Sequence, residues 1–362
     1  MDQSSRLIEL GQASMFGIVK RLARYYLSKP IVLQPGATET WLKAHEDVTI
    51  ITSPSAKSSI ESIISKNRYK VFLDPPIEVS ALDALVPEIK TSWIAGIGAG
   101  RVMDVSKYLA LRSKCKLCLI PAVLSTTSWL NMAIALRKNN ILHFPGTKHA
   151  TTTIVDPDFI LKAPISLSLG GLADILASCS ALTDWEIAGE KVGEKVSLHG
   201  IAAFKTLIEK VLSQIETYKK GTADSINLIY ETFLEALSLC GASFSGRPVE
   251  GSEHFLFYLA EETCQKRFVH GEIIALMTLV SLQLQGARAI ITPDRLRNFF
   301  DGLSMKYAPS DLDIDRDEMN KILSNASRFT MERKLEYTIL NADAKISKGE
   351  VDLDLLDWIY AL

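Results

Sequence analysis

The pattern of apolar residues changes near residue 158, and this change most constrains the fold. Before it, short β-rich runs alternate with helical stretches, as in a parallel sheet with crossover helices. After it, long amphipathic runs with few β-branched clusters predict helices. We therefore expect an α/β domain over residues 1–157 and an all-α domain over residues 158–362. The predicted strands are Pro30–Leu33, Val48–Thr52, Lys70–Leu73, Ser92–Ala95 and Lys116–Ile120, and the predicted helices of the second domain are Leu167–Ala188, Gly200–Glu216, Asp224–Ala242, Gly251–Glu262 and Gly271–Ala287.

Composition excludes several classes of partner. The formal net charge of −2, without a basic block, argues against nucleic acid. The five cysteines, an odd number without a disulfide framework of spacings, indicate reduced thiols in the cytoplasm. We find no apolar run of the roughly 20 residues that a membrane span needs, and no signal peptide. The somewhat basic segment Leu7–Leu27 predicts a helix, either lying on its own domain or touching a membrane surface or partner subunit.

A glycine loop follows one predicted strand. Gly98, Ala99 and Gly100 lie between the strand Ser92–Ala95 and the predicted helix Val102–Arg112. Backbone N–H groups at such a helix start can receive a pyrophosphate, since ligands of open α/β sheets bind beyond the carboxyl ends of the strands. Glycines after a strand can equally be plain turn residues.

Three residues of the helical part fit a catalytic metal site. Asp174, His254 and His270 lie in the strings GLADILA, GSEHF and RFVHGE. Catalytic zinc and related ions take three protein ligands from the histidine and carboxylate set and keep one position open. Taken singly, each histidine could be a helix cap or a satisfied core residue. The adjacent Glu253 and Glu272 could orient the imidazoles or cap their helices.

Six segments, in order, resemble one family. They are GIGAGRVMDVSKYLA, IPAVLSTTSWLNM, VDPDFILKAP, GLADILASCSALTDWEIA, SGRPVEGSEH and HGE. Together they are similar to the sn-glycerol-1-phosphate dehydrogenase branch of the iron-containing alcohol dehydrogenase and dehydroquinate synthase-like superfamily. The resemblance implies a Rossmann-like α/β domain followed by an all-α domain, the dehydroquinate synthase-like fold. It also implies that Asp174, His254 and His270 bind the metal, with zinc expected first and nickel or iron as alternatives.

The resemblance further assigns cofactor contacts. Asp104 and Lys107 resemble the Asp and Lys of the family's dinucleotide loop, although they could form only a solvated ion pair. Ser53 stands where relatives commonly place an acid that repels a 2′-phosphate, and Lys57 follows four residues later. The resemblance therefore implies NAD or NADP as cofactor, with NADPH accepted at least as well as NADH, although Ser53 could also lie in a plain turn.

Two positions depart from the family pattern. Ala99 replaces the middle glycine of the usual three. In the second cofactor segment, Ser125, Thr126 and Thr127 are expected near the nicotinamide and substrate, and Thr127 stands where the branch normally has an Asp. Either polyol binding is rearranged here or the natural substrate differs.

The activity implied by the resemblance is reduction of dihydroxyacetone phosphate to sn-glycerol 1-phosphate, or of a related small ketone or polyol. Arg247 could bind a phosphate-bearing substrate, or lock a loop by bonding carbonyls. Alternatives are a dehydroquinate synthase-like lyase, or a non-catalytic relative that binds metal and cofactor. We expect a cytoplasmic homo-oligomer with its active site where the two domains face each other.

Overall fold

The computed structural model describes residues 31–65 and 69–362, and these form two compact units. The first unit comprises residues 31–168, apart from 66–68, together with Gly221–Asn227; the second comprises Leu169–Lys220 and Leu228–Leu362. The helix predicted at Leu7–Leu27 lies outside the described residues. An α/β part followed by a helical part confirms the predicted fold class.

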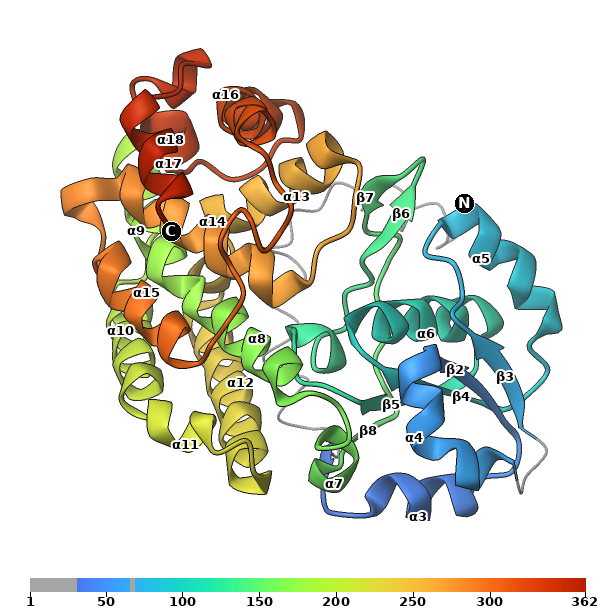
Figure 1. Ribbon diagram of the computed structural model, residues 1–362. Helices are drawn as coiled ribbons and strands as arrows, with labels where there is room; N and C mark the ends of the chain where they lie inside the picture. The colour runs from blue at the N-terminus through green and yellow to red at the C-terminus, as the bar shows by residue number, and fades with distance from the viewer. Residues whose placement is uncertain (1–30, 66–68) are drawn as a thin grey trace. The chain divides into compact units, whose positions relative to one another are not determined.

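The first unit is built on a six-stranded parallel sheet with the strand order β1-β8-β5-β4-β2-β3. Every residue of β2 is buried, as are nearly all of β4 and β5, and this burial on both faces fits their mostly apolar sequences. In Figure 1, α6 lies on one face of the sheet and α3 and α4 lie on the other. The strands are β1 (Ile31–Leu33), β2 (Val48–Thr52), β3 (Lys70–Leu73), β4 (Trp93–Gly98), β5 (Lys116–Pro121) and β8 (Thr152–Val155), and the helices are α3 (Ala37–Lys43), α4 (Pro54–Ile64), α5 (Val79–Leu85), η2 (Val86–Glu88), α6 (Gly100–Ser113), η3 (Thr127–Trp129) and α7 (Pro157–Ile160).

Three strands were missed by the sequence prediction. β8 inserts between β1 and β5, although its β-branched TTIV was a usable signal. The antiparallel pair β6 (Leu136–Lys138) and β7 (Ile141–His143) is joined by Asn139 and Asn140, both with positive φ. Consecutive asparagines between apolar residues fit such a tight turn, because Asn tolerates the left-handed conformation.

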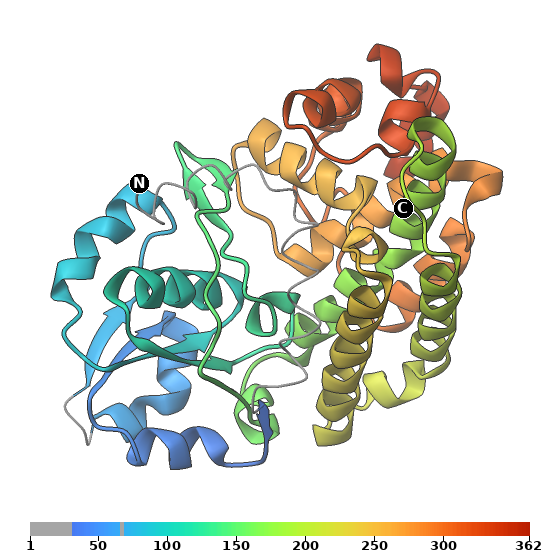
Figure 2. The same cartoon turned by 180° about the vertical axis from the view of Figure 1, so that it is seen from behind.

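The second unit is helical. Helix α12 lies along α10 (Figure 2). The ammonium of Lys210 on α10 lies 2.6 Å from a carboxylate oxygen of Glu235 on α12. The helices are α8 (Ile165–Leu176), α9 (Ser178–Val192), α10 (Leu198–Ser213), α11 (Ile215–Lys219), α12 (Ala223–Ser243), η4 (Arg247–Val249), α13 (Ser252–Cys264), α14 (His270–Gln285), η5 (Gly286–Arg288), α15 (Pro293–Gly302), α16 (Arg316–Glu332), α17 (Ile339–Ala342), η6 (Ile346–Lys348) and α18 (Leu353–Tyr360).

One stretch of the described residues, Ile165–Val192, is long and apolar enough by composition to cross a membrane. Within its most apolar window 83% of the residues are buried, so its apolar side chains form core rather than a lipid-facing surface.

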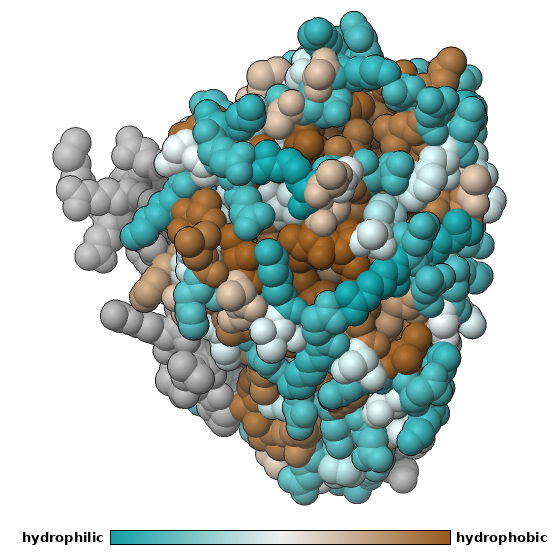
Figure 3. All heavy atoms as spheres, turned by 90° about the vertical axis from the view of Figure 1, so that its left-hand side faces the viewer, coloured by the Kyte–Doolittle hydropathy of each residue, from teal (hydrophilic) through white to brown (hydrophobic). Residues whose placement is uncertain are grey.

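On the face drawn in Figure 3, hydrophilic side chains surround hydrophobic ones that show between them.

Candidate metal centre and cofactor segments

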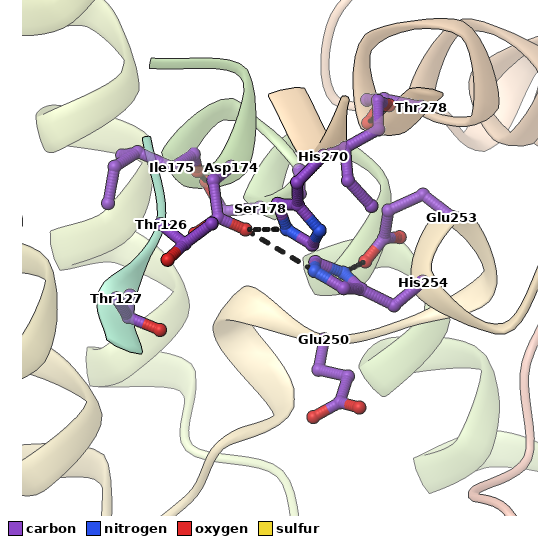
Figure 4. Close-up of polar contacts among 12 residues, drawn as sticks. Thr126, Thr127, Asp174, Ile175, Ser178, Glu250, Glu253, His254, His270 and Thr278 are labelled. Atoms are coloured by element: carbon purple, nitrogen blue, oxygen red, sulfur yellow. Dashed lines mark hydrogen bonds and ion pairs between the residues drawn. The ribbon is translucent and has the colours of Figure 1, made fainter. Parts of the chain in front are cut away.

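The structure brings Asp174, His254 and His270 together within the second unit. One carboxylate oxygen, Asp174 Oδ1, lies 3.3 Å from Nε2 of His254 and 3.0 Å from Nε2 of His270. The three potential ligand atoms all lie within 4.8 Å of one another, and Figure 4 shows the side chains pointing toward a common point. Asp174 and His254 are buried and His270 is partly exposed, so one side of the group is open.

Three helices supply these side chains, and glycines let the helices approach. Asp174 lies on α8, His254 in the first turn of α13 and His270 at the start of α14. Gly251, just before α13, lies so close to Ala181 of α9 that a side-chain carbon there would be 2.9 Å from the Ala181 Cα. This close approach holds the start of α13, and with it His254, against the core.

The spacing fits a small divalent ion. Ligand atoms 2.0–2.1 Å from a tetrahedral ion lie about 3.3 Å apart, because they occupy the corners of one tetrahedron. The two distances from Asp174 Oδ1 to the histidine nitrogens match this value. One carboxylate and two imidazoles with an open side thus suit a catalytic ion.

Glu253 fixes the orientation of one imidazole. Its fully buried carboxylate accepts hydrogen bonds from the Gly251 N–H and the Ser180 hydroxyl, each at 2.7 Å, and lies 2.9 Å from Nδ1 of His254. With Nδ1–H directed at this carboxylate, Nε2 of His254 faces Asp174 as an acceptor suited to metal binding. Glu272, by contrast, lies in the first turn of α14 and interacts electrostatically with Lys306.

The electrostatics of the group favour positive charge. Burial alone would lower the pKa of His254, but hydrogen bonds and charges from Asp174 and Glu253 outweigh it and raise the pKa to about 10. Burial alone would raise the pKa of Asp174, but the charge of His270 and hydrogen bonds from both histidines bring it well below its ordinary value. A cation is therefore stabilised among these carboxylates.

Sequence reasoning missed a second acid beside His254. The carboxylate of Glu250 accepts a hydrogen bond of 2.8 Å from the hydroxyl of Tyr258, whose ring lies 6.3 Å from that of His254. Burial raises the pKa of Glu250 to about 7, against the opposing charge of His254. No periodic signal in the sequence pointed to Glu250, because it lies in extended backbone before α13 begins at Ser252.

Arg247 has partners that suit a structural role. Its buried guanidinium donates from Nη2 to the carbonyls of Tyr337 (2.7 Å) and Asp184 (3.2 Å) and forms an ion pair with Glu194. Of the two roles predicted for Arg247, these contacts match the locking of a loop. A guanidinium already bound to two carbonyls has fewer donors left for a substrate phosphate.

The glycine loop lies at the carboxyl edge of the sheet, as expected for a phosphate site. Gly98 ends β4, Ala99 precedes α6 and Gly100 begins it, and no side chain caps this helix. The first amides of α6 are therefore not used by a capping side chain. Ser53 follows the neighbouring strand β2 and caps α4 by accepting from the Ala56 N–H at 3.3 Å. Lys57 pairs with Glu61.

The second cofactor segment adjoins the glycine loop within the first unit. A side-chain carbon at Gly100 would be 3.1 Å from the Thr126 hydroxyl and 3.2 Å from that of Ser128. Thr126 caps η3, which begins at Thr127, and the partly buried Ser125 precedes it. These residues and the loop residues thus lie in one neighbourhood.

Asp104 and Lys107 form an ion pair of 2.8 Å, and both are buried. The alternative of a solvated surface pair is therefore wrong. Lys107 is fully buried, and its ammonium is bound to oxygens of the segment after η3, so its contacts are with the protein.

Comparison with known proteins agrees with the motifs. Residues 42–164 match the family model described as iron-containing alcohol dehydrogenase. Over 295 residues the chain is 28% identical to the glycerol-1-phosphate dehydrogenase (NAD(P)+) of Thermoplasma acidophilum, covering 80% of this chain and 82% of the relative. An iron-containing alcohol dehydrogenase from Thermococcus thioreducens superposes with a TM-score of 0.66 at 15% identity, covering 92% of this chain and 98% of that one.

A sulfoacetaldehyde reductase from Bifidobacterium kashiwanohense, solved in complex with NAD+, superposes with a TM-score of 0.62 at 15% identity, covering 92% of this chain and 96% of that one. Both structural likenesses show the fold. The sequence matches carry the resemblance further: residues 42–164 are similar to iron-containing alcohol dehydrogenases, and four fifths of the chain is similar to a glycerol-1-phosphate dehydrogenase.

Proposed function

We propose that the protein is a metal-dependent NAD(P)H oxidoreductase that reduces dihydroxyacetone phosphate, or a related small ketone or polyol. The observation that carries the proposal is the convergence of Asp174 with His254 and His270 at metal-ligand spacing. The name of the relative, a glycerol-1-phosphate dehydrogenase using NAD(P)+, supports the choice of reaction.

Asp174, His254 and His270 would hold the divalent ion, and zinc is our first choice, with nickel and iron as alternatives. When bound there, such an ion polarises a substrate carbonyl toward hydride attack. Glu253 holds the imidazole of His254 in position through Nδ1. The partly exposed His270 lies on the open side, where a substrate can approach.

The cofactor would bind at the carboxyl edge of the sheet. The first amides of α6, behind Gly98, Ala99 and Gly100, are placed to receive the pyrophosphate. Ser53, at the end of the adjacent strand, offers no carboxylate to a 2′-phosphate, so both NADH and NADPH are acceptable. The cofactor supplies the hydride, and the protein supplies alignment. That the nicotinamide and the metal meet between the two domains remains a prediction from the sequence.

The decisive experiment combines metal analysis with turnover. The purified protein is analysed for zinc, nickel and iron, and oxidation of NADH and NADPH is followed with dihydroxyacetone phosphate, dihydroxyacetone and other small ketones. We expect about one metal ion per chain and net cofactor oxidation, because a lyase that uses NAD transiently shows no net oxidation.

The ligand assignment is tested by replacing Asp174, His254 or His270 with Ala, one at a time. Each change should remove both metal and activity, whereas His199→Ala, at an exposed position on α10, should remove neither. Full metal occupancy in all three variants would falsify the site.

We also propose a cytoplasmic, homo-oligomeric protein. All five cysteines are free thiols, which suits a reducing compartment. The subunit number is measured directly by light scattering during size-exclusion chromatography.

A further inference from the structure

A fully buried lysine organises the segment that carries Thr127. The ammonium of Lys107 donates to Asp104 Oδ1 at 2.8 Å, to the Ala133 carbonyl at 2.5 Å and to Asn131 Oδ1 at 3.2 Å. The Asn131 carbonyl adds a fourth oxygen at 3.4 Å, and the lysine side chain itself has no exposed surface. Loss of any of these bonds leaves a buried charge less well satisfied, so the arrangement is strongly determined.

The lysine also fixes which way the Asn131 amide points. An ammonium group has donors and no acceptor, so it can face only the oxygen of the amide. The NH₂ group of Asn131 must then face the other way, and there it donates to the hydroxyl oxygen of Thr127 at 3.1 Å. The orientation follows from the chemistry of the lysine and needs no choice between amide rotamers.

This bond sets the direction of the Thr127 hydroxyl. Its oxygen accepts from Asn131, so its own proton points elsewhere, and no hydrogen bond from this hydroxyl to another described residue is found. Thr127 is only partly buried, at the start of η3, beside the segment that adjoins Gly100 of the glycine loop. The hydroxyl therefore offers a free donor at its exposed side.

We propose that Asn131 is a positioning residue that makes Thr127 a hydrogen-bond donor to an acceptor oxygen of the bound cofactor or substrate. The inference rests on the proposed function, because it takes Thr127 to face one of these ligands. A carboxylate at this position could only accept and would select a ligand hydroxyl. The donor formed here instead selects a carbonyl, carboxamide or phosphate oxygen, because a ligand that can only donate leaves the Thr127 proton unpaired.

Asn131→Asp tests this directly because it keeps the shape and reverses the hydrogen bond. Both oxygens of the new side chain accept, so Lys107 keeps a partner while Thr127 turns its proton inward to the carboxylate. Thr127→Val removes the hydroxyl and keeps the branched shape, and Thr127→Ser is the matched control that keeps the donor. The double variant Asn131→Asp/Thr127→Val separates positioning from a general structural effect.

Two readouts identify which ligand carries the acceptor. Fluorescence titration with NADPH measures the Kd of the cofactor without turnover, and steady-state kinetics measures kcat/KM for dihydroxyacetone phosphate and dihydroxyacetone. For the ligand that contacts Thr127, we expect Asn131→Asp and Thr127→Val each to weaken the readout about fivefold, which corresponds to roughly 1 kcal/mol for one hydrogen bond. Thr127→Ser, which keeps the donor, should recover most of the loss seen in Thr127→Val, and the double variant should match Thr127→Val alone.

The inference is overturned if the losses of the two single variants add up in the double variant. It is also overturned if Thr127→Val shows no loss by either readout. Unchanged metal content and thermal unfolding temperature serve as folding controls for the four variants. If the wild type reduces no ketone, the proposed reaction fails, and the NADPH titration alone decides the role of Asn131. If NADPH does not bind either, both proposals are rejected.

Discussion

Gly271 lies against Gly170 so closely that a side-chain carbon on Gly271 would be 2.3 Å from the Gly170 carbonyl oxygen. This backbone contact joins α14, which carries His270, to α8, which carries Asp174. The contact is asymmetric, because a side-chain carbon on Gly170 would meet the Gly271 Cα at 3.4 Å, an ordinary van der Waals distance. The glycine of the HGE motif is thus required by helix packing beside the candidate metal ligands.

Gly271→Ala should force the two helices apart. We expect a loss of about 1–3 kcal/mol in the free energy of unfolding, typical of overpacking, and at least a tenfold loss of metal affinity. Gly170→Ala is the matched control. It should retain metal binding and unfold at a urea concentration at least as high as the wild type, because alanine is the better helix former. Urea unfolding and metal titration measure both, and equal behaviour of the two variants would contradict the packing argument.

Glu253→Gln should weaken metal binding by about 10- to 100-fold, the usual effect of removing a carboxylate that orients a ligating histidine. The carboxylate accepts from three donors, and an amide oxygen with an adjacent NH₂ group cannot serve all of them. Ser180→Ala, which removes one of these donors, should have a smaller effect. Competition with a chromogenic chelator reports the affinities, and wild-type affinity in Glu253→Gln would refute the orienting role.

Ser53→Asp should shift cofactor preference toward NADH by about tenfold or more, because a carboxylate there repels the 2′-phosphate and can bond the ribose. Aspartate is also a good helix cap, so α4 should keep its start. The ratio of kcat/KM for the two cofactors is the measurement. Ser53→Ala loses the cap without adding charge, and a similar shift in that variant would show that the cap, rather than the charge, sets the preference.

Arg247→Ala should act mainly on stability. The guanidinium donates to the carbonyls of Tyr337 and Asp184 and pairs with Glu194, so removing it loses these contacts at a cost of about 1–3 kcal/mol. The ratio of kcat/KM for dihydroxyacetone phosphate to that for dihydroxyacetone should stay unchanged. A loss of kcat/KM for dihydroxyacetone phosphate alone would instead indicate that Arg247 binds the substrate phosphate.

Glu250 should make the metal-free protein less stable as pH rises. Burial raises the pKa of Glu250 from 4.5 to about 7, and Glu336 adds to this, whereas His254 and the hydrogen bond from Tyr258 oppose it. The folded state therefore favours the protonated carboxyl. Its contribution to stability is fully present below about pH 4.5 and is lost as pH rises through 7.

Urea unfolding with a chelator present, at pH 5 and pH 8, measures this dependence. Glu250→Gln should flatten the decline between the two values, whereas Glu231→Gln, at an exposed position on α12, should follow the wild type. A wild-type decline in Glu250→Gln would assign the dependence to other groups.

The sequence predicted the elements whose periodicity is strong. β2 and β3 have the predicted bounds, and β4 extends past Ala95 to Gly98, because backbone pairing with β5 continues through the glycines. The single helix predicted at Leu167–Ala188 is divided near Ala177 into α8 and α9, a break that apolar periodicity does not mark.

For the candidate site, the short sequence motifs around Asp174, His254 and His270 were enough to identify these three residues, because each motif resembles its counterpart in the family. The partners of Lys107, Arg247 and Thr127 could not be predicted, since each depends on residues brought near by folding. A buried lysine and a surface lysine look alike in sequence. Only the tertiary structure shows which lysine donates its hydrogen bonds to other groups of the protein.

The apolar stretch Ile165–Val192 has a consequence for synthesis. Helices α13, α14 and α17, which pack on its second half, α9, come later in the chain. While the ribosome makes the intervening residues, this stretch emerges without the partners that cover it, and it has the composition of a membrane segment. Truncation before α13 should therefore yield a nascent chain that aggregates or is held by chaperones, whereas the full chain buries the same residues around Asp174.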